Sequence, residues 1–307
     1  MTAIAAPREI ASGLKFPEGP IALDDGSVIL VEIARGTLSR VRADGRVQVL
    51  ARLGGGPNGA AMGPDGAIYV CNNGGFAWRK RKGLLAPGHV PDDYSGGRIE
   101  RVDLSTGKVE RLYEACDGEA LRGPNDLVFD AQGGFWFTDH GKSTAAHRDW
   151  GALYYAKADG SRITRVRGPI MAPNGVGLSP DEQTVYYAET LSGRLLAADI
   201  VPASGKTPAS LGPLRLAGSG PGLSYFDSLA VQADGAVCVA TLFNAGVSVI
   251  KPGGKVRFVS LPGDPYVTNL CFGGKALKTA FVTLSGTGRL VALEWPARGL
   301  PLNFLNK

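Results

Sequence analysis

The sequence contains no long apolar run. No window approaches the roughly 18 consecutive apolar residues that a membrane-spanning helix needs. The N-terminal stretch MTAIAAPREIASGLKF also lacks the basic region and apolar core of a secretion signal. We therefore expect a soluble, cytoplasmic protein with no membrane partner.

Clustered cysteines and the short motifs of several enzyme classes are missing as well. The four cysteines form no CxxC pair, and three of them lie in apolar, strand-like runs. This pattern predicts buried free thiols in a reducing compartment. No GxSxG, HExxH or phosphate-binding glycine loop occurs, so serine hydrolases, zinc proteases and nucleotide enzymes lack support.

Charge gives little direction, because the formal net charge is only +5 over 307 residues. The one concentrated basic run is Arg79-Lys80-Arg81-Lys82, which follows Trp78 and adjoins Gly- and Pro-rich sequence. A single run of this kind is typical of a solvated loop, and a nucleic-acid patch is the alternative. We expect no nucleic-acid partner.

Glycine and proline are abundant, with 44 and 20 residues spread along the chain, which indicates many tight turns and few helices. One phrase recurs six times: a polar residue near Pro or Gly, an apolar pair, a turn and a strand-like run. The copies follow one another at intervals of about 40 to 70 residues, as propeller blades do. They begin at Pro17, Pro57, Pro124, Pro173, Phe226 and Thr268.

A third strand-like run, and usually a fourth, follows each copy. The last copy ends at Trp295-Pro296 without a fourth run, and the N-terminal REIASGL could supply it. Such an exchange would close the ring and remove the exposed sheet edges. The sequence thus predicts an all-β fold, a six-bladed β-propeller with four-stranded antiparallel blades, as a single domain over residues 1–307. With its edges hidden, we expect a monomer.

Equivalent polar residues begin the innermost strand of every predicted blade, so they should converge around the central channel at one face. All of them offer an oxygen atom: Glu18, Asn58, Asn125, Asn174, Asp227, and Thr268 or Asn269. In the repeat alignment Glu18 lies one residue early, which the flanking Pro17 and Pro20 could accommodate as a bulge that fixes the direction of the carboxylate.

Two carboxylates and several amide oxygens, with no His or Cys among them, suit a hard cation. Ca²⁺ accepts several oxygen ligands in flexible geometry, which makes calcium the first choice, with Mg²⁺, Mn²⁺ or Zn²⁺ as alternatives. Asn58 in Pro-Asn-Gly is equally well explained as a turn residue. Glu18 and Asp227 are not needed for their turns, and a charged group in a buried strand requires a partner.

Several motifs in order, FPEGP, RGPNDLVFDAQGGFWFTD, APNGVGLSPDEQTVYYAET, YFDSLAVQADGAVCVAT and TNLCFGG, resemble the senescence marker protein/gluconolactonase family of calcium-dependent six-bladed propellers. The likeness runs from about Phe16 to Thr283. It implies a divalent metal held by Glu18, Asn174 and Asp227, with Asn125 as a further ligand or substrate contact. It also implies hydrolysis of lactones and, in some relatives, of phosphotriesters.

One departure bears on the substrate. Sugar-lactonase members that resemble this chain often carry an Arg two residues before the third-blade Asn, where it contacts sugar hydroxyls; here that position is Gly123, with Arg122 one residue further away. A more apolar or aromatic lactone is therefore an alternative to a gluconate-type one. Aromatic residues that should overhang the same face are Phe76, Trp78, Trp150, Tyr225 and Phe243.

The expected reaction is attack of water on a small-molecule lactone whose carbonyl is polarised by the metal. Asp227 is the candidate general base, in addition to its place among the metal ligands Glu18, Asn125 and Asn174, and the resemblance to phosphotriesterase-like relatives implies a nucleophile as the alternative role. Candidate substrate contacts are Asn58, Arg122, Asn125 and His140. The alternatives are an organophosphate hydrolase of the same fold and a non-catalytic, calcium-stabilised propeller that binds a ligand.

Overall fold

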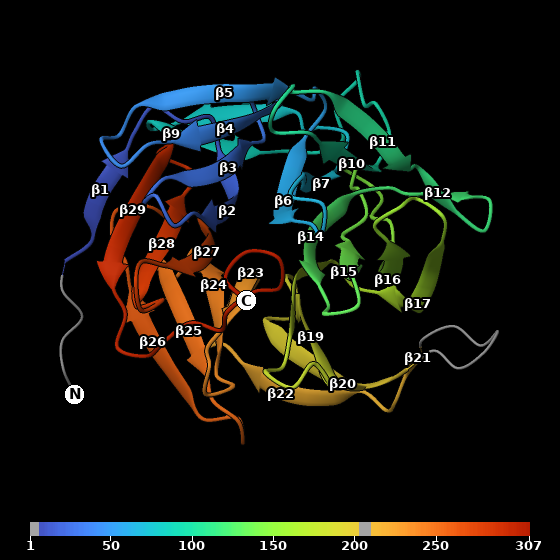
Figure 1. Cartoon of the computed structure of the whole chain (residues 1–307). Helices are drawn as coiled ribbons and strands as arrows, with labels where there is room; N and C mark the ends of the chain where they lie inside the picture. The colour runs from blue at the N-terminus through green and yellow to red at the C-terminus, as the bar shows by residue number, and fades with distance from the viewer. Residues whose placement is uncertain (1–5, 203–209) are drawn as a thin grey trace.

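The repeated runs of β-branched and aromatic residues fold into strands, and Gly- and Asp-containing turns reverse the chain between them. The computed structural model describes residues 6–202 and 210–307. These residues form a ring of six small antiparallel sheets and contain no helix, which confirms the predicted six-bladed β-propeller (Figure 1). In the same two ranges, therefore, no helix could cross a membrane.

Blades 1 to 3 are consecutive in the sequence. Blade 1 consists of β2 (Pro17–Ala22), β3 (Val28–Glu32), β4 (Thr37–Val41) and β5 (Val47–Arg52). Blade 2 consists of β6 (Pro57–Met62), β7 (Ile68–Asn72), β10 (Arg98–Val102) and β11 (Val109–Tyr113). After the short hairpin β12 (Ala115–Cys116) and β13 (Glu119–Ala120), blade 3 consists of β14 (Pro124–Phe129), β15 (Gly134–Asp139), β16 (Gly151–Lys157) and β17 (Ile163–Ile170).

Blades 4 to 6 complete the ring. Blade 4 consists of β18 (Pro173–Leu178), β19 (Thr184–Glu189), β20 (Arg194–Val201) and β22 (Arg215–Ser219), and β21 (Ser210–Leu211) pairs with the end of β20. Blade 5 consists of β23 (Tyr225–Val231), β24 (Val237–Leu242), β25 (Gly246–Ile250) and β26 (Val256–Ser260). Blade 6 consists of β27 (Val267–Gly273), β28 (Thr279–Leu284), β29 (Arg289–Glu294) and, as its outermost strand, β1 (Arg8–Ala11).

The first strand of every blade lines the centre of the ring. Each of these strands contacts its counterparts in the two neighbouring blades, in the circular order β2, β6, β14, β18, β23 and β27. Six hydrophobic clusters fill the spaces between neighbouring blades, one for each junction. Because a blade packs against a neighbour on both faces, second strands such as β3 and β7 are buried along their whole length.

All four cysteines are buried and free, as predicted from their apolar surroundings. Cys238 and Cys271, for example, belong to two of the inter-blade clusters. Burial raises the pKa of both thiols to about 12, so neither is a ready nucleophile.

The longest insertion in the repeat, residues 73–97, joins β7 to β10 in blade 2. It carries a hairpin of β8 (Trp78–Arg81) and β9 (Leu84–Pro87). The Leu85 N–H donates to the Gly286 carbonyl of blade 6 at 2.8 Å. The insertion therefore extends from blade 2 past blade 1 to blade 6, and the basic run at 79–82 forms its exposed tip.

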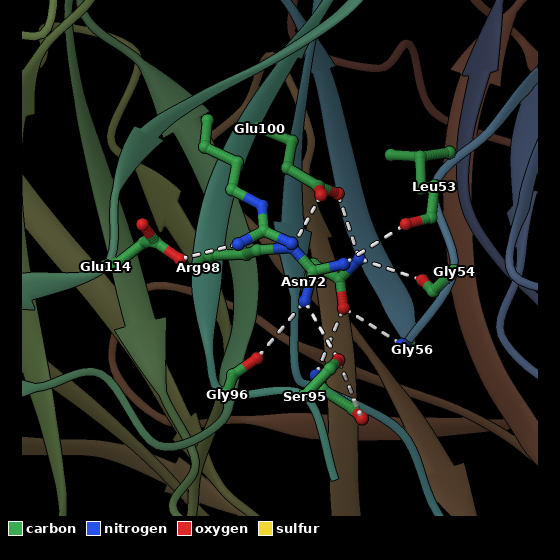
Figure 2. A network of polar contacts seen from close by, with 11 residues as sticks. Leu53, Gly54, Gly56, Asn72, Ser95, Gly96, Arg98, Glu100 and Glu114 are labelled. Carbon is green, nitrogen blue, oxygen red and sulfur yellow. Dashed lines mark hydrogen bonds and ion pairs between the residues drawn. The ribbon is translucent and has the colours of Figure 1, made fainter. Parts of the chain in front are cut away.

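A buried ion pair supports the end of this insertion (Figure 2). Arg98 and Glu100 are each 2% exposed, and Arg98 Nε donates to Glu100 Oε1 at 2.5 Å. The remaining guanidinium N–H groups donate to the Ser95 hydroxyl and to the carbonyls of Leu53 and Gly96. Since a buried charge pair is tolerated only when its other hydrogen-bonding groups are satisfied, these contacts hold the insertion to blade 2.

Asn72 supports the start of the insertion in the same network (Figure 2). Its Nδ2 donates to Glu100 Oε2 at 2.9 Å, while its Oδ1 accepts from the N–H groups of Gly56 and Gly74. Gly56 leads directly into β6. One polar network thus fixes both ends of the insertion and the beginning of the innermost strand of blade 2.

The end of the channel opposite the strand starts holds a mainly apolar cavity of about 110 Å³. It is lined by the first strands of all six blades and by the segment that follows blade 6, from Leu300 to Lys307. In Figure 1 the C-terminal end of the chain lies over the centre of the ring. Asn303 Nδ2 anchors this segment through the Phe129 carbonyl and Glu182 Oε1.

Candidate active site

The polar residues at the strand starts form an outer ring at one end of the channel, here called the mouth. The outer ring consists of Glu18, Asn58, Asn125, Asn174, Asp227 and Thr268. Each directly follows a residue paired with the second strand. The pairing register shifts at the outer-ring residue itself in blades 2 to 6 and directly after Glu18 in blade 1. The β-bulge is therefore common to all six blades.

This shared bulge corrects the expectation that Glu18 lies one residue early. Pro17 pairs with Glu32 in the same way that Pro57 pairs with Asn72, so Glu18 occupies the same register position as Asn58. The first strands of blades 1 and 2 and the turns after them have the same length, so Pro17 aligns with Pro57. Only the bulge of blade 1, between Glu18 and Ile21, lies one residue further along than that of blade 2. Pro17 and Pro20 flank a bulge that the other blades form as well.

The bulge also directs the next residue of every blade toward the channel, which creates an inner ring. The inner ring consists of Gly19, Gly59, Asp126, Gly175, Ser228 and Asn269. Its glycines leave space for the larger members: a Cβ on Gly59 would lie 2.7 Å from Asp126 Oδ1 and 2.5 Å from the Asn125 carbonyl oxygen. Gly19, Asp126 and Asn269 also line the cavity, which places this ring below the outer one.

Glu18 is buried and hydrogen-bonded across the closing junction of the ring. Its Oε2 accepts from Asn269 Nδ2 at 2.7 Å and from the Gly19 N–H at 2.9 Å. Thr268, the other sixth-blade candidate, is bonded mainly to the hydroxyls of Thr283 and Ser285. Burial raises the pKa of Glu18 to about 7, against the opposing effect of these hydrogen bonds.

Asp126 is a third acid at the site, and sequence reasoning missed it. Its side chain is buried and accepts the Leu127 N–H at 2.9 Å. Burial, and then the negative charge of Glu18, raise the pKa of Asp126 to about 7. The signal in the sequence is Pro-Asn-Asp: of the six copies, only this one has an acid directly after the outer-ring residue. The sequence does not show that both side chains face the channel, because that depends on the bulge.

Asp227 is half-buried and lies beside Asn174 of the preceding blade. Burial and the charge of Glu18 raise the pKa of Asp227 well above its usual range, although a hydrogen bond with Asn174 opposes the shift. Asn174 Nδ2 donates to Thr190 Oγ1 at 3.1 Å, and its Oδ1 accepts weakly from Ser228 Oγ at 3.4 Å. The amide is thus oriented with its oxygen toward blade 5.

Asn125 carries a buried Oδ1 for which residues 6–202 and 210–307 provide no hydrogen-bond donor. Buried side-chain oxygens without a partner are uncommon in folded proteins and call for an explanation. A cation at the mouth would supply the missing interaction. Asn58 is buried in the equivalent position of blade 2.

The donor set therefore fits a hard cation. Burial is the main cause that raises the pKa of Glu18, Asp126 and Asp227, and the charge of Glu18 adds to the shift of the other two. The described residues contain no group of three or more His, Cys, Asp and Glu side chains arranged to hold a metal. Amide oxygens would have to complete the coordination, as they do at many Ca²⁺ sites.

His140 lies at the mouth on the loop after β15, with both ring nitrogens engaged. Nδ1 is 3.2 Å from the Pro173 carbonyl, so it carries the proton and donates, and Nε2 then accepts from Arg148 Nη2 at 3.4 Å. Burial and the charge of Arg148 lower the pKa of His140 to about 3. The imidazole is neutral at physiological pH.

Arg122, the other predicted substrate contact in blade 3, has an exposed side chain. Its N–H and that of Gly123 each donate to the Asp139 carboxylate at 2.7 Å. A Cβ on Gly123 would lie 2.7 Å from the Gly141 carbonyl oxygen. An Arg at position 123 would therefore displace the backbone of the neighbouring loop.

A six-bladed propeller with an acid- and amide-lined channel mouth is the class of protein that the fold and site define. The profile of the SMP-30/gluconolactonase/LRE-like region family matches residues 16–286. The chain belongs to this family, as its motifs predicted.

Two curated relatives carry lactonase names. Lactonase drp35 of Staphylococcus saprophyticus is 30% identical over 246 residues, which cover 78% of this chain and 67% of the relative. Gluconolactonase of Zymomonas mobilis is 26% identical over 307 residues, which cover 90% of this chain and 78% of the relative.

Solved structures of more distant proteins share the fold. A gluconolactonase of Xanthomonas campestris superimposes with a TM-score of 0.73 at 23% identity, covering 94% of this chain and 89% of the other. A calcium-binding regucalcin of Agrobacterium tumefaciens also gives a TM-score of 0.73, at 18% identity, covering 98% of this chain and 97% of the other.

Proposed function

We propose that this protein is a metal-dependent hydrolase that opens lactones. The observation that carries the proposal is the set of oxygen donors at the channel mouth, Glu18, Asn125, Asn174 and Asp227, in which the buried Asn125 Oδ1 has no hydrogen-bond donor among the described residues. Isolated buried carboxylates are strongly disfavoured unless they are neutralised or bind a cation. The lactonase and gluconolactonase names of the relatives support lactones as the substrate class.

Glu18, Asn125, Asn174 and Asp227 would hold the cation, with Ca²⁺ as the first choice among divalent ions. The oxygen-only donors and the calcium-binding regucalcin of the same fold support this choice. When bound, a divalent cation polarises an ester carbonyl and stabilises the charge that develops on its oxygen. Asn269 orients Glu18 through their 2.7 Å hydrogen bond and would keep the carboxylate aimed at the mouth.

Asp227 would act as general base. It is the most exposed of the three acids, so its carboxylate can meet water at the mouth. In its ionised form it accepts a proton from the attacking water, and the carbonyl carbon then gains the new bond to oxygen while the ring C–O bond breaks. The released ring oxygen takes up the proton, and the product is a hydroxy acid.

The remaining polar residues would orient the substrate. Asn58 and Asn125 face the mouth from blades 2 and 3, and the exposed Arg122 can reach substrate only from the rim. His140 has a pKa of about 3, and both of its ring nitrogens are hydrogen-bonded, one to the Pro173 carbonyl and the other to Arg148. We assign it to substrate positioning at the mouth and not to proton transfer.

The test is hydrolysis by protein that has been stripped with a chelator and then supplied with Ca²⁺, Mg²⁺, Mn²⁺ or Zn²⁺. The substrate panel contains a sugar lactone, an aromatic lactone and a fluorophosphate, and Glu18→Gln is assayed beside the wild type. Lactone turnover that one metal restores and that Glu18→Gln abolishes supports the proposal. Preferential fluorophosphate turnover would identify an organophosphate hydrolase instead. A melting temperature that rises with Ca²⁺, without turnover of any substrate, would identify a ligand-binding propeller.

A further inference from the structure

Six aromatic side chains form a continuous line of ring contacts on the mouth face. In order of contact, this aromatic arc consists of Phe76, Trp78, Phe16, Tyr266, Phe243 and Tyr225. Successive ring centroids lie 6.0, 5.2, 5.9, 5.5 and 5.4 Å apart, and most of the pairs meet edge to face. The rings come from blades 2, 1, 6 and 5, with Trp78 in the hairpin strand β8 and Tyr225 at the start of β23, so the arc follows one side of the mouth.

Both halves of the arc adjoin residues of the proposed metal site. Phe16 stands two residues before Glu18, and Tyr225 stands two residues before Asp227. Two rings of the arc therefore lie on the same chain segments as the two acids of the outer ring, just before them. If the carbonyl of a substrate lies between Glu18 and Asp227, the substituent of that substrate can reach the rings of the arc.

The backbone holds two of these rings in an unfavourable conformation. Phe16 has φ of 58° and Phe243 has φ of 62°, both in the left-handed region that bulky residues rarely adopt. Such strain persists where the surroundings enforce it, and it is concentrated at functional sites. Phe243 is nevertheless 57% exposed, so burial of its own ring does not explain why the conformation is maintained.

The blade 2 insertion places the other end of the arc. Its hairpin brings Trp78 onto Phe16 and is held at both ends by the Asn72–Arg98–Glu100 network. Lys142 Nζ lies 4.0 Å from the centroid of Phe76 and donates to Asn73 Oδ1 and the Gly75 carbonyl. The arc therefore ends against the Lys142 amine of blade 3.

The opposite side of the mouth has a different character. Blades 3 and 4 contribute the amide and imidazole side chains of Asn125, Asn174 and His140. The mouth is thus polar on one side and aromatic on the other. That division suits a lactone ring that carries an aryl substituent and few hydroxyl groups.

We infer that the aromatic arc is the subsite for an aryl substituent of the lactone, and that Trp78 and Phe243 determine this specificity. The inference rests on the proposed lactonase function where it concerns hydrolysis of the aryl lactone. Binding of the aryl group by the arc does not depend on that function. Aromatic rings favour edge-to-face or offset contact with another ring, which an alkyl chain or a sugar cannot reproduce. Phe16 is buried, so the partly exposed rings on either side of it, Trp78 and Phe243 among them, offer such contacts.

The first test compares two δ-lactones that differ only in a phenyl or a hydroxymethyl substituent. Trp78→Ala and Phe243→Ala should each lower kcat/KM for the phenyl lactone roughly tenfold, mainly by raising KM, because the ring contact is the same in ground state and transition state. Both variants should change kcat/KM for the hydroxymethyl lactone less than twofold. Trp78→Phe keeps a ring and should therefore retain most of the wild-type kcat/KM for the phenyl lactone.

Trp150→Ala is the matched control. Trp150 is 62% exposed on the loop of blade 3 that follows β15, and it takes part in none of the ring contacts of the arc. Its removal should leave both lactones unaffected. Equal losses on both lactones, or no loss with either arc variant, would overturn the inference.

A binding measurement separates this inference from the proposed function. The δ-lactam with the same phenyl substituent resists hydrolysis, and its affinity is measured by calorimetry in the presence of Ca²⁺. If no lactone is hydrolysed but the lactam binds the wild type about tenfold more tightly than Trp78→Ala, the subsite stands and the hydrolase proposal fails. If lactones are hydrolysed but the lactam binds both proteins equally, the subsite fails and the hydrolase proposal stands.

Discussion

Asn269 Nδ2 donates to Glu18 Oε2 at 2.7 Å, so the last blade orients the carboxylate that the first blade contributes to the candidate site. These two residues are 251 positions apart in the sequence. The junction at which the N-terminal strand β1 completes blade 6 is therefore also the junction at which the acid is held. Blade 6 thus both receives the closing strand β1, which pairs with β29, and holds Glu18 through Asn269 of β27.

The first prediction concerns this hydrogen bond. Asn269→Ala should weaken Ca²⁺ binding about tenfold or more, because a ligand that loses its supporting hydrogen bond is no longer held in one orientation. Calorimetric titration of chelator-stripped protein measures the change. Asn58→Ala is the control, since Asn58 lies in the outer ring of blade 2 but does not bond to Glu18. A similar loss of affinity in both variants would show that the contact has no special role.

The second prediction concerns the acid that the sequence did not reveal. Asp126→Asn should raise the melting temperature of metal-free protein at pH 8 by a few degrees, corresponding to about 1 kcal/mol, because it removes one of three neighbouring buried carboxylates. The amide oxygen can still accept the Leu127 N–H that Asp126 Oδ1 accepts. Thermal unfolding with excess chelator tests this, and a clear decrease in melting temperature would argue that the charge of Asp126 is compensated.

The same variant should bind Ca²⁺ more weakly, since the cation loses part of the negative potential at the mouth. Stabilisation without metal and weaker binding with metal are opposite effects of one removed charge. Their joint occurrence would separate an electrostatic role of Asp126 from a purely steric one.

Asp126 marks the limit of what the sequence predicts about the site. The blades could be predicted because strand-forming runs and Gly- or Asp-containing turns repeat at propeller intervals, and the outer ring follows because each copy begins with a polar residue. Whether one or two successive residues face the channel depends on the bulge, which is a property of strand pairing. The sequence alignment placed this bulge in blade 1 alone, so Asp126 was overlooked.

The aromatic arc illustrates a second limit of the sequence. Phe76, Trp78, Tyr225 and Phe243 could be assigned to the mouth face from their positions in loops between strands. Their connection through Phe16 and Tyr266 depends on the path of the 73–97 insertion, which crosses to blade 6. Long-range docking of a loop leaves no periodic signal, which is why Trp150 could not be distinguished from the rings of the arc.

The third prediction concerns pH. Burial lowers the pKa of Lys142 from 10.5 to about 7, although the nearby carboxylates of Asp139 and Asp149 favour its charged form and His140 and Arg148 lie on the same loop. Between about pH 7 and 10.5 the unfolded chain keeps this proton while the folded chain releases it. The unfolded state then binds more protons, so the contribution of Lys142 to the free energy of unfolding rises with pH.

Urea unfolding of wild type and Lys142→Met at pH 7 and pH 9.5 measures this contribution. The difference in unfolding free energy between the two proteins should shift in favour of the wild type at the higher pH, by about 1 kcal/mol or more. Lys275→Met, at an exposed position of blade 6, is the control for loss of a lysine at the surface. A flat difference for Lys142→Met would mean that its amine keeps the same charge in both states.

The last prediction separates proton transfer from metal binding at Asp227. Asp227→Asn keeps an oxygen ligand and the volume of the side chain, but it removes the group that accepts the proton of the attacking water. Turnover at saturating Ca²⁺ should therefore fall by about 100-fold or more, while the dissociation constant for Ca²⁺ rises by less than about tenfold. Steady-state kinetics with a lactone and calorimetry with Ca²⁺ measure the two quantities on the same preparation. Comparable losses in both would assign Asp227 to the metal alone, and the base would then have to be sought among the remaining acids, with Asp126 the first to examine because its carboxylate lies directly below the outer ring.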